Sequence, residues 1–133
     1  NYIGIINKQA VASFSKEYIK KFNIILTSGR QLIEELSGGN QQKCIISKWL
    51  LTHPTILILD EPTRGVDVGV KSEMYDIIKK LSETGTSIIL ISSELPEILS
   101  LSHRIVVMRE GQISNTLEHK DASQETIMTN AIN

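Results

Sequence analysis

The chain has 133 residues, of which 14 are Lys or Arg and 15 are Asp or Glu, and its formal net charge is −1. With 41% apolar and 22% charged residues, the composition is typical of a globular chain and excludes a disordered tail. The single cysteine, Cys44, excludes an intrachain disulfide, and aromatic residues at 5% are too few for a nucleic-acid surface. No apolar run approaches the roughly 18 residues of a membrane span. The start at Asn1 without a Met favours a piece of a longer chain.

The first third of the sequence predicts helices. Apolar residues recur at spacings of three and four, which predicts a helix over residues 7–22. A Ser-Gly-Gly-Asn turn at residues 37–40 then leads into a second helix over residues 41–51, which ends before Pro54. On the first helix this spacing places Val11, Phe14, Tyr18 and Phe22 on one face. On the second helix the expected buried side consists of Ile45, Ile46, Trp49 and Leu50.

The rest of the chain alternates strands and helices. Residues 56–59 are apolar at every position, which is typical of a parallel strand buried on both faces. The further elements expected are a helix at 70–81, a strand at 87–91, a helix at 97–101, a strand at 104–108 that turns through Glu110-Gly111 into 112–115, and a short tail helix within 121–131. This order predicts an α/β fold with a parallel sheet.

Two carboxylates follow the first strand directly. Asp60 and Glu61 fall at its carboxyl end, the edge of an open α/β sheet at which ligands bind. One carboxylate there can hold Mg²⁺ through water, and the next can orient a water that attacks a phosphoryl group. Taken alone, the pair is equally the polar end of a surface strand.

The turn before the second helix has a different chemistry. Gly38 and Gly39 allow backbone N–H groups to approach a ligand closely, and a helix N-terminus favours an anion. The hydroxyl of Ser37 adds one donor, which suits a terminal phosphate. Taken alone, Ser37 is equally an ordinary N-cap.

Four motifs in one order resemble those of ATP-binding cassette (ABC) ATPases. Leu36–Lys43 resembles the signature motif, Ile56–Thr63 the Walker B strand with its following glutamate, and Gly65–Asp67 the D-loop. Ile91–Glu94 lies where the family has its switch-histidine segment. The match extends from Leu36 to about Asn115, so it covers most of the chain.

Finer details are similar to the second, carboxy-terminal cassette of bacterial monosaccharide importers of the ribose, galactose and xylose type. These details are Asn40 in place of the usual Gln, T-R-G-V-D-V-G at 63–69, and S-S-E-L-P-E at 92–97. The family's phosphate-cradling Walker A loop, G-x-x-x-x-G-K-[ST], does not occur in the sequence. We therefore expect a polypeptide of this sequence alone to hydrolyse no ATP.

The resemblance implies the carboxy-terminal part of a P-loop NTPase (RecA-like) ABC core with a parallel sheet, preceded by part of the α-helical subdomain. We expect residues 1–52 to form that subdomain, ending in the signature motif and its helix. Residues 53–133 are expected to form the core part, with the Walker B strand, the D-loop and the switch segment.

The resemblance also implies roles for individual residues. Asp60 would hold Mg²⁺ through water, Glu61 would serve the attacking water, and Asp67 would contact the opposite cassette across an interface. Ser93 stands at the switch position in place of histidine, which implies a weak or degenerate site around Glu61. The residues expected to contact ATP in trans, in the site of the other cassette, are Ser37, Gly38, Gly39, Asn40 and Gln41.

A second departure is His103, which occupies a position where the family usually has Asp. A surface or half-buried histidine is expected there, without a catalytic role.

The function implied is that of the ATP-binding and ATP-hydrolysing subunit of an ABC importer, which couples ATP hydrolysis to uptake of a simple sugar. Expected partners are a second cassette in the same polypeptide or a dimer mate, membrane permease subunits and, indirectly, a periplasmic or lipoprotein sugar-binding protein, with no nucleic acid. The place expected is the cytoplasmic face of the bacterial membrane, as a peripheral subunit. Import of nucleosides or of a signalling sugar, and a non-transport ABC ATPase that acts as a clamp or regulator, remain alternatives.

Overall fold

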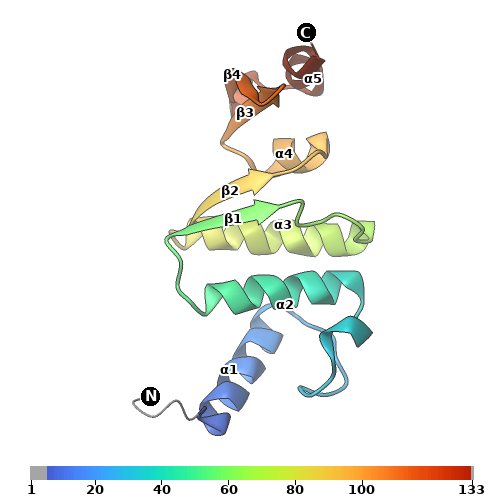
Figure 1. Ribbon diagram of the computed structural model, residues 1–133, viewed down its shortest axis with the longest axis vertical. Helices are drawn as coiled ribbons and strands as arrows, with labels where there is room; N and C mark the ends of the chain where they lie inside the picture. Colours follow the sequence, from blue (N-terminus) through green and yellow to red (C-terminus); the bar gives the residue numbers. More distant parts are fainter. Residues whose placement is uncertain (1–5, 133) are drawn as a thin grey trace. The chain divides into compact units, whose positions relative to one another are not determined.

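The computed structural model describes residues 6–132, and its elements follow the predicted order (Figure 1). By its internal contacts the chain forms two compact units. The first contains the residues up to Thr55 together with Thr63–Ile77, and the second contains Ile56–Pro62 and the residues from Ile78 on. The helices are α1 (Lys8–Lys21), α2 (Gly38–Leu50), α3 (Val68–Glu83), α4 (Leu95–Leu101) and α5 (Gln124–Ile132), and the strands are β1 (Ile56–Asp60), β2 (Ser87–Ile91), β3 (Arg104–Arg109) and β4 (Gln112–Glu118).

In the first unit, α1 begins at a side-chain cap. The Oδ1 atom of Asn7 accepts hydrogen bonds from the backbone N–H groups of Gln9 and Ala10, at 3.0 and 3.1 Å. These bonds satisfy two of the amides that a helix leaves unpaired at its start. After α1, Phe22 and Ile24 are buried, whereas Phe14, on the apolar face that the sequence predicts for α1, is 52% exposed.

The buried face of α2 differs in part from the predicted one. Ile46 and Leu50 are buried as expected, but Ile45 and Trp49 are 44% and 54% exposed. The observed face includes Lys43 and lies at spacings of three and four along the helix. Ile45 and Trp49 lie about 100° round the helix from Ile46 and Leu50, so burial of both pairs requires a wider contact than this unit provides.

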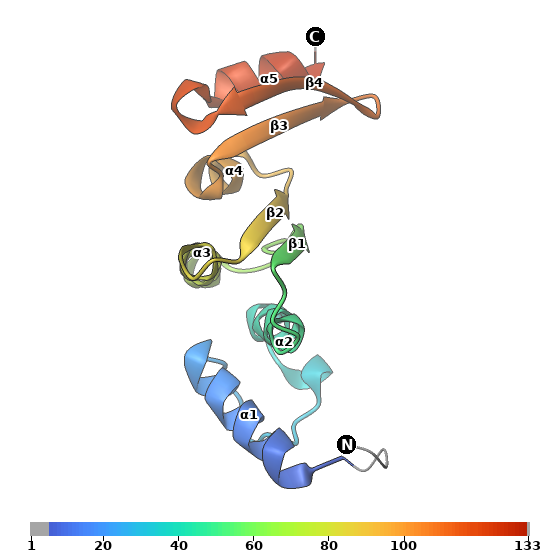
Figure 2. The ribbon, with the colours of Figure 1, turned by 90° about the vertical axis from the view of Figure 1, so that its left-hand side faces the viewer.

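In the second unit, β1 and β2 form a parallel pair in which Ile58 lies opposite Ile89 (Figure 2). Leu57 and Leu59 are buried, whereas Ile56 and Ile58 are 59% and 61% exposed. The burial of β1 on both faces that its sequence predicts is therefore not observed in this structure. The alternation follows from the strand period of two, which sends successive side chains to opposite faces.

The same unit contains the antiparallel pair of β3 and β4, which extends to Glu118, three residues beyond the predicted end. The predicted tight turn is confirmed: Glu110 and Gly111 have φ of +50° and +79° and connect Arg109 to its partner Gln112. Two left-handed residues match the twist of a two-residue hairpin. On one face, Ile105, Val107 and Ile127 of α5 form a buried cluster.

Candidate functional site

The signature turn lies in the first unit, at the start of α2. Ser37 is the extended N-cap residue, and its carbonyl accepts the first helical bond from the Gln41 N–H at 2.9 Å. The Ser37 side chain makes no capping bond. Its hydroxyl is exposed and accepts a hydrogen bond from Asn40 Nδ2 at 2.9 Å. The turn therefore combines an exposed hydroxyl with the amides that begin a helix, which is the chemistry of an anion site.

The amide side chains of the turn bond within this chain. Asn40 Oδ1 accepts a hydrogen bond from the Ile25 N–H at 2.9 Å, and Gln41 Nε2 donates to the Leu36 carbonyl at 2.8 Å. Asn40 thus connects the Ser37 hydroxyl to the segment after α1. The sequence motif does not reveal these bonds, because their partners lie outside it or on the backbone.

Gly39 is buried against the D-loop and the start of α3. A Cβ atom at Gly39 would lie 2.3 Å from Val70 Cγ1 and 3.4 Å from Val66 Cγ1. A Cβ at Gly38 would lie 3.7 Å from the Gly65 carbonyl oxygen, an ordinary contact. Close packing therefore requires glycine at position 39, a reason distinct from ligand approach.

Asp67 lies at the end of the D-loop and is exposed. Its carbonyl accepts bonds from the N–H groups of Val70 and Lys71, at 3.0 and 2.9 Å, so Asp67 is where α3 begins. Gly65, with φ of +71°, makes the turn before it. The first unit thus brings the signature turn and the D-loop together.

The second unit brings Asp60, Glu61 and Ser93 together at the carboxyl ends of β1 and β2. Asp60 is exposed and lies opposite Ile91 in the parallel pair. The Glu61 N–H donates to the Ile91 carbonyl at 2.8 Å, which extends the pairing by one residue. Glu61 has φ of +47°, a strained conformation for a residue other than glycine, and strain of this kind is concentrated at functional sites.

The switch segment holds the Glu61 carboxylate through its backbone. The Ser93 N–H donates to Glu61 Oε1 at 2.9 Å, while Ser93 itself is exposed. This contact uses the amide of Ser93, which any residue except proline would supply, so the identity of the side chain does not predict it.

The residues present fit a magnesium ion that is mostly held by water and phosphate. Within residues 6–132, no group of three or more His, Cys, Asp and Glu side chains is placed to bind a metal ion by itself. Mg²⁺ keeps several waters and needs only one or two carboxylates. An exposed Asp60 at the carboxyl edge of a parallel pair meets that requirement.

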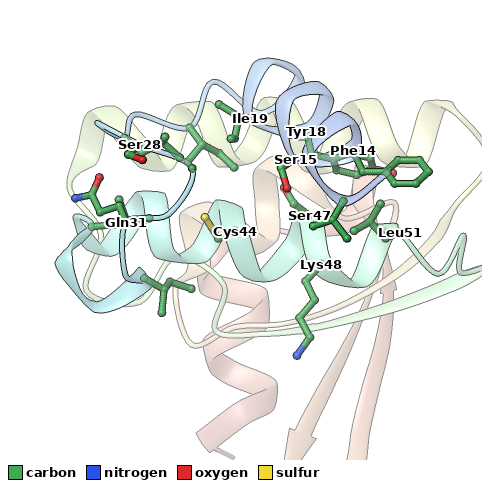
Figure 3. Close-up of a pocket in the computed structure, with 16 residues that line it drawn as sticks. Phe14, Ser15, Tyr18, Ile19, Ser28, Gln31, Cys44, Ser47, Lys48 and Leu51 are labelled. Carbon is green, nitrogen blue, oxygen red and sulfur yellow. The ribbon is translucent and has the colours of Figure 1, made fainter. Parts of the chain in front are cut away.

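A separate apolar hollow of about 360 Å³ lies in the first unit, between α1, α2 and the segment that joins them (Figure 3). Phe14 and Tyr18 contribute from α1, and Cys44 and Ser47 from α2. Burial raises the pKa of the Cys44 thiol, which disfavours the thiolate. The signature residues 37–41 do not line this hollow.

His103 is exposed, as predicted, and its carbonyl accepts a bond from the His119 N–H at 3.0 Å. Between Ile6 and Ile132, none of the helices has the length and apolar character needed to cross a bilayer.

Comparison with solved structures shows the fold. An ATP-binding cassette of an ABC transporter, MJ1267, matches with a TM-score of 0.80 over 99% of this chain and 54% of that chain, at 22% identity. A nucleotide-free ATP-binding cassette from an ABC transporter matches with a TM-score of 0.77 over 96% of this chain and 49% of that chain, at 23% identity. The predicted fold class, a partial P-loop NTPase core of the ABC type with a parallel sheet, is confirmed.

Sequence relatives are much closer. The ribose import ATP-binding protein RbsA of Bacillus cereus is 50% identical over 94% of this chain and 25% of its own length. RbsA of Caldanaerobacter subterraneus is 52% identical over 99% of this chain and 27% of its length, and the xylose import ATP-binding protein XylG of Thermoanaerobacter pseudethanolicus is 50% identical over 94% and 25%. The chain thus spans about a quarter of the length of the curated relatives it matches.

The family model for ABC transporters matches residues 6–64, which include the signature motif and the Walker B strand. The cassette fold, the four motifs in order and the identity of about half with import ATP-binding proteins agree with this match. The chain is therefore similar, over nearly its whole length, to ATP-binding proteins of ABC transporters.

Proposed function

We propose that this chain is part of an ATP-binding subunit that couples ATP hydrolysis to the uptake of a simple sugar. The observation that carries the proposal is the identity of about 50% with proteins named as ribose and xylose import ATP-binding proteins, over nearly the whole chain. The exposed Ser37 hydroxyl at a helix start and the exposed Asp60 at a sheet edge support it.

In the proposed mechanism, the first unit serves an ATP site whose Walker motifs belong to a second cassette. The Ser37 hydroxyl and the first amides of α2, from Gly38 and Gly39, donate to the terminal phosphate, which favours the positive end of a helix. Asn40 orients the hydroxyl through its hydrogen bond, and Gln41 closes the turn. Asp67 contacts the opposite cassette and couples the two sites.

The second unit serves the other site. Asp60 holds Mg²⁺ through water, and the ion offsets phosphate charge when it is bound. Glu61 orients the attacking water, but its Oε1 atom already accepts a hydrogen bond from the Ser93 N–H. Ser93 lacks an imidazole that could contact phosphate and carry a proton. We therefore propose that this second site is the weaker one.

The proposed partners are a second cassette, in the same polypeptide or in a dimer mate, and membrane permease subunits on the cytoplasmic face. Residues 1–52 form the helical subdomain in this proposal, and residues 53–133 the core part. A sugar-binding protein outside the membrane delivers the sugar to the permease.

Because the two sites are proposed to differ in activity, variants at the two sites should lose ATP turnover to different extents. In the full-length protein, reconstituted with its permease and sugar-binding protein, Ser37→Arg should lower ATP turnover by about 10²-fold, because a long cation replaces a small donor at the competent site. Glu61→Gln should lower turnover less, since it alters the weaker site. Phosphate release measures both, and equal or reversed losses contradict the assignment.

The sugar assignment has its own readout. At least one of ribose, xylose and galactose, with its binding protein, should stimulate ATP turnover, and nucleosides should not. Stimulation by nucleosides alone would replace the sugar with that alternative. ATP turnover that is the same with and without the permease would indicate a non-transport ABC ATPase that acts as a clamp or regulator.

A further inference from the structure

Lys43 is a buried cation inside the signature helix. Its side chain is 3% exposed, and its Nζ atom donates to the Glu73 carboxylate of α3 and to the Asn23 carbonyl, the latter at 3.2 Å. Glu73 is half-exposed at 49%, so it keeps part of its hydration. A buried ammonium needs such partners, because burial of an unpaired charge costs several kcal/mol.

Lys43 and Glu73 lie beside the two motifs of the first unit, the signature turn and the D-loop. Lys43 lies four residues after Gly39 on α2, and Glu73 lies three residues after Val70 on α3. Residues at these spacings share one helix face. Helix α2 and the first half of α3 start at the same end and lie side by side (Figure 1). The helices therefore meet at two points, Gly39 against Val70 and, one turn later, Lys43 against Glu73.

Two contacts between a pair of helices constrain their relative geometry more than a single contact does. The contact at Gly39 sets how closely the helices approach, and the ion pair about 6 Å further along sets their rotation about that contact. The signature turn begins α2, and the D-loop leads directly into α3. A fixed pair of helices therefore keeps the distance and orientation of the Ser37 hydroxyl relative to Asp67 constant.

We propose that Lys43 is a positioning residue, which fastens the signature turn to the D-loop through Glu73 so that ATP in trans and the opposite cassette are contacted together. The inference rests on the proposed function only for the identity of the ligand. The ion pair of Lys43 with Glu73, called the clamp below, joins two helices of this unit whatever the ligand is.

The first test measures the clamp without any ATP turnover. In the full-length protein, Lys43→Met removes the charge and keeps much of the volume, and the Glu73 carboxylate that loses its partner is half-exposed, so water can solvate it. The amides of Gln41, Val70 and Lys71 are hydrogen-bonded at the starts of the two helices. Their hydrogen exchange should rise together by about tenfold, the scale of coupling between contacting groups, while peptides from β3 and β4 stay unchanged.

The second test separates positioning from folding. Lys43→Met should raise the KM for ATP by about tenfold, because the trans contact contributes to nucleotide binding. A purely structural role would lower kcat through the folded fraction and leave KM as it is. Lys43→Arg keeps a cation for Glu73 and should restore most of the wild-type KM.

Lys48→Met is the matched control, because Lys48 lies on the same helix but is exposed and stacks over Trp49. It should change neither exchange nor KM. Unchanged exchange at Gln41, Val70 and Lys71 in Lys43→Met overturns the clamp. Raised exchange with an unchanged KM overturns its role at the ATP site. If Lys43→Met raises exchange but no sugar stimulates ATP turnover by the wild-type protein, the proposed function is refuted and the clamp is retained.

Discussion

Among the glycines that the structure describes, Gly39 has the least room for an added side chain. A methyl group there would lie 2.3 Å from Val70 Cγ1, so either α2 or α3 must shift. We expect Gly39→Ala to destabilise the full-length protein by about 1–3 kcal/mol, the usual cost of overpacking. Gly69→Ala is the control, since Gly69 lies inside α3 with nothing within 4 Å of an added Cβ.

The control should be neutral or stabilising by about 0.5–1 kcal/mol, because alanine favours the helix over glycine. Thermal unfolding measures both variants. Equal shifts of the two unfolding midpoints would show that the contact with Val70 relaxes at no cost.

A substitution at Ser93 can test whether the site proposed to use Glu61 is weak because it lacks a histidine. If the proposed assignment holds, the turnover that remains in a Ser37→Arg background comes from the site that uses Glu61. Ser93→His adds an imidazole that can contact phosphate, so we expect turnover in this background to rise by at least about tenfold, at the low end of what a positioned proton carrier contributes.

The gain should disappear in the triple variant that also carries Glu61→Gln. Phosphate release is the measurement throughout. A rise that survives Glu61→Gln would mean that the histidine acts without Glu61 and that the role given to the carboxylate is wrong.

Helices α1 and α2 each start at a residue that commonly caps helices, Asn7 and Ser37, yet the two starts differ. Asn7 caps α1 with its side chain, whereas Ser37 leaves its hydroxyl outside the helix. We expect Asn7→Ala to raise hydrogen exchange of the Val11 amide about fivefold, which corresponds to about 1 kcal/mol for a lost cap. Ser37→Ala should leave exchange of the Gln41 amide nearly unchanged.

The two amides are matched, because each donates to the carbonyl of its own N-cap residue, at 3.1 Å for Val11 and 2.9 Å for Gln41. Equal increases in the two variants would make Ser37 an ordinary N-cap and would weaken its assignment to a ligand.

At the scale of the whole molecule, the sequence contains the signature motif and the strand that ends in Asp60 and Glu61, but no Walker A pattern with its lysine. A polypeptide of this sequence alone should therefore release no phosphate from Mg·ATP, because the β- and γ-phosphates lack their cradle. The full-length protein is the positive control. Turnover by the short polypeptide that Glu61→Gln abolishes would contradict the expectation.

The outer face of β1 and β2 is a second property at this scale. Ile56, Ile58, Ile89 and Ile91 are all about half exposed or more on the described part of the chain. A parallel pair normally has both faces covered. The composition of β1 predicts burial on both faces, and in this structure Leu57 and Leu59 are buried on one face only.

The sequence by itself determined the order of the elements, the two-residue hairpin turn and the resemblance to ABC ATPases, because these depend on local chemistry: periodicity, glycine at positive φ, and short motifs in fixed order. The tertiary structure decided which flank of α2 is buried, why residue 39 is glycine, and that the Ser93 amide holds Glu61. Helical periodicity permits Ile45 and Trp49 or Lys43 and Ser47 to flank Ile46 and Leu50, and only the neighbouring segments select between them. The partners of Lys43 and Glu61 lie 30 and 32 residues away along the chain, so no local pattern encodes those contacts.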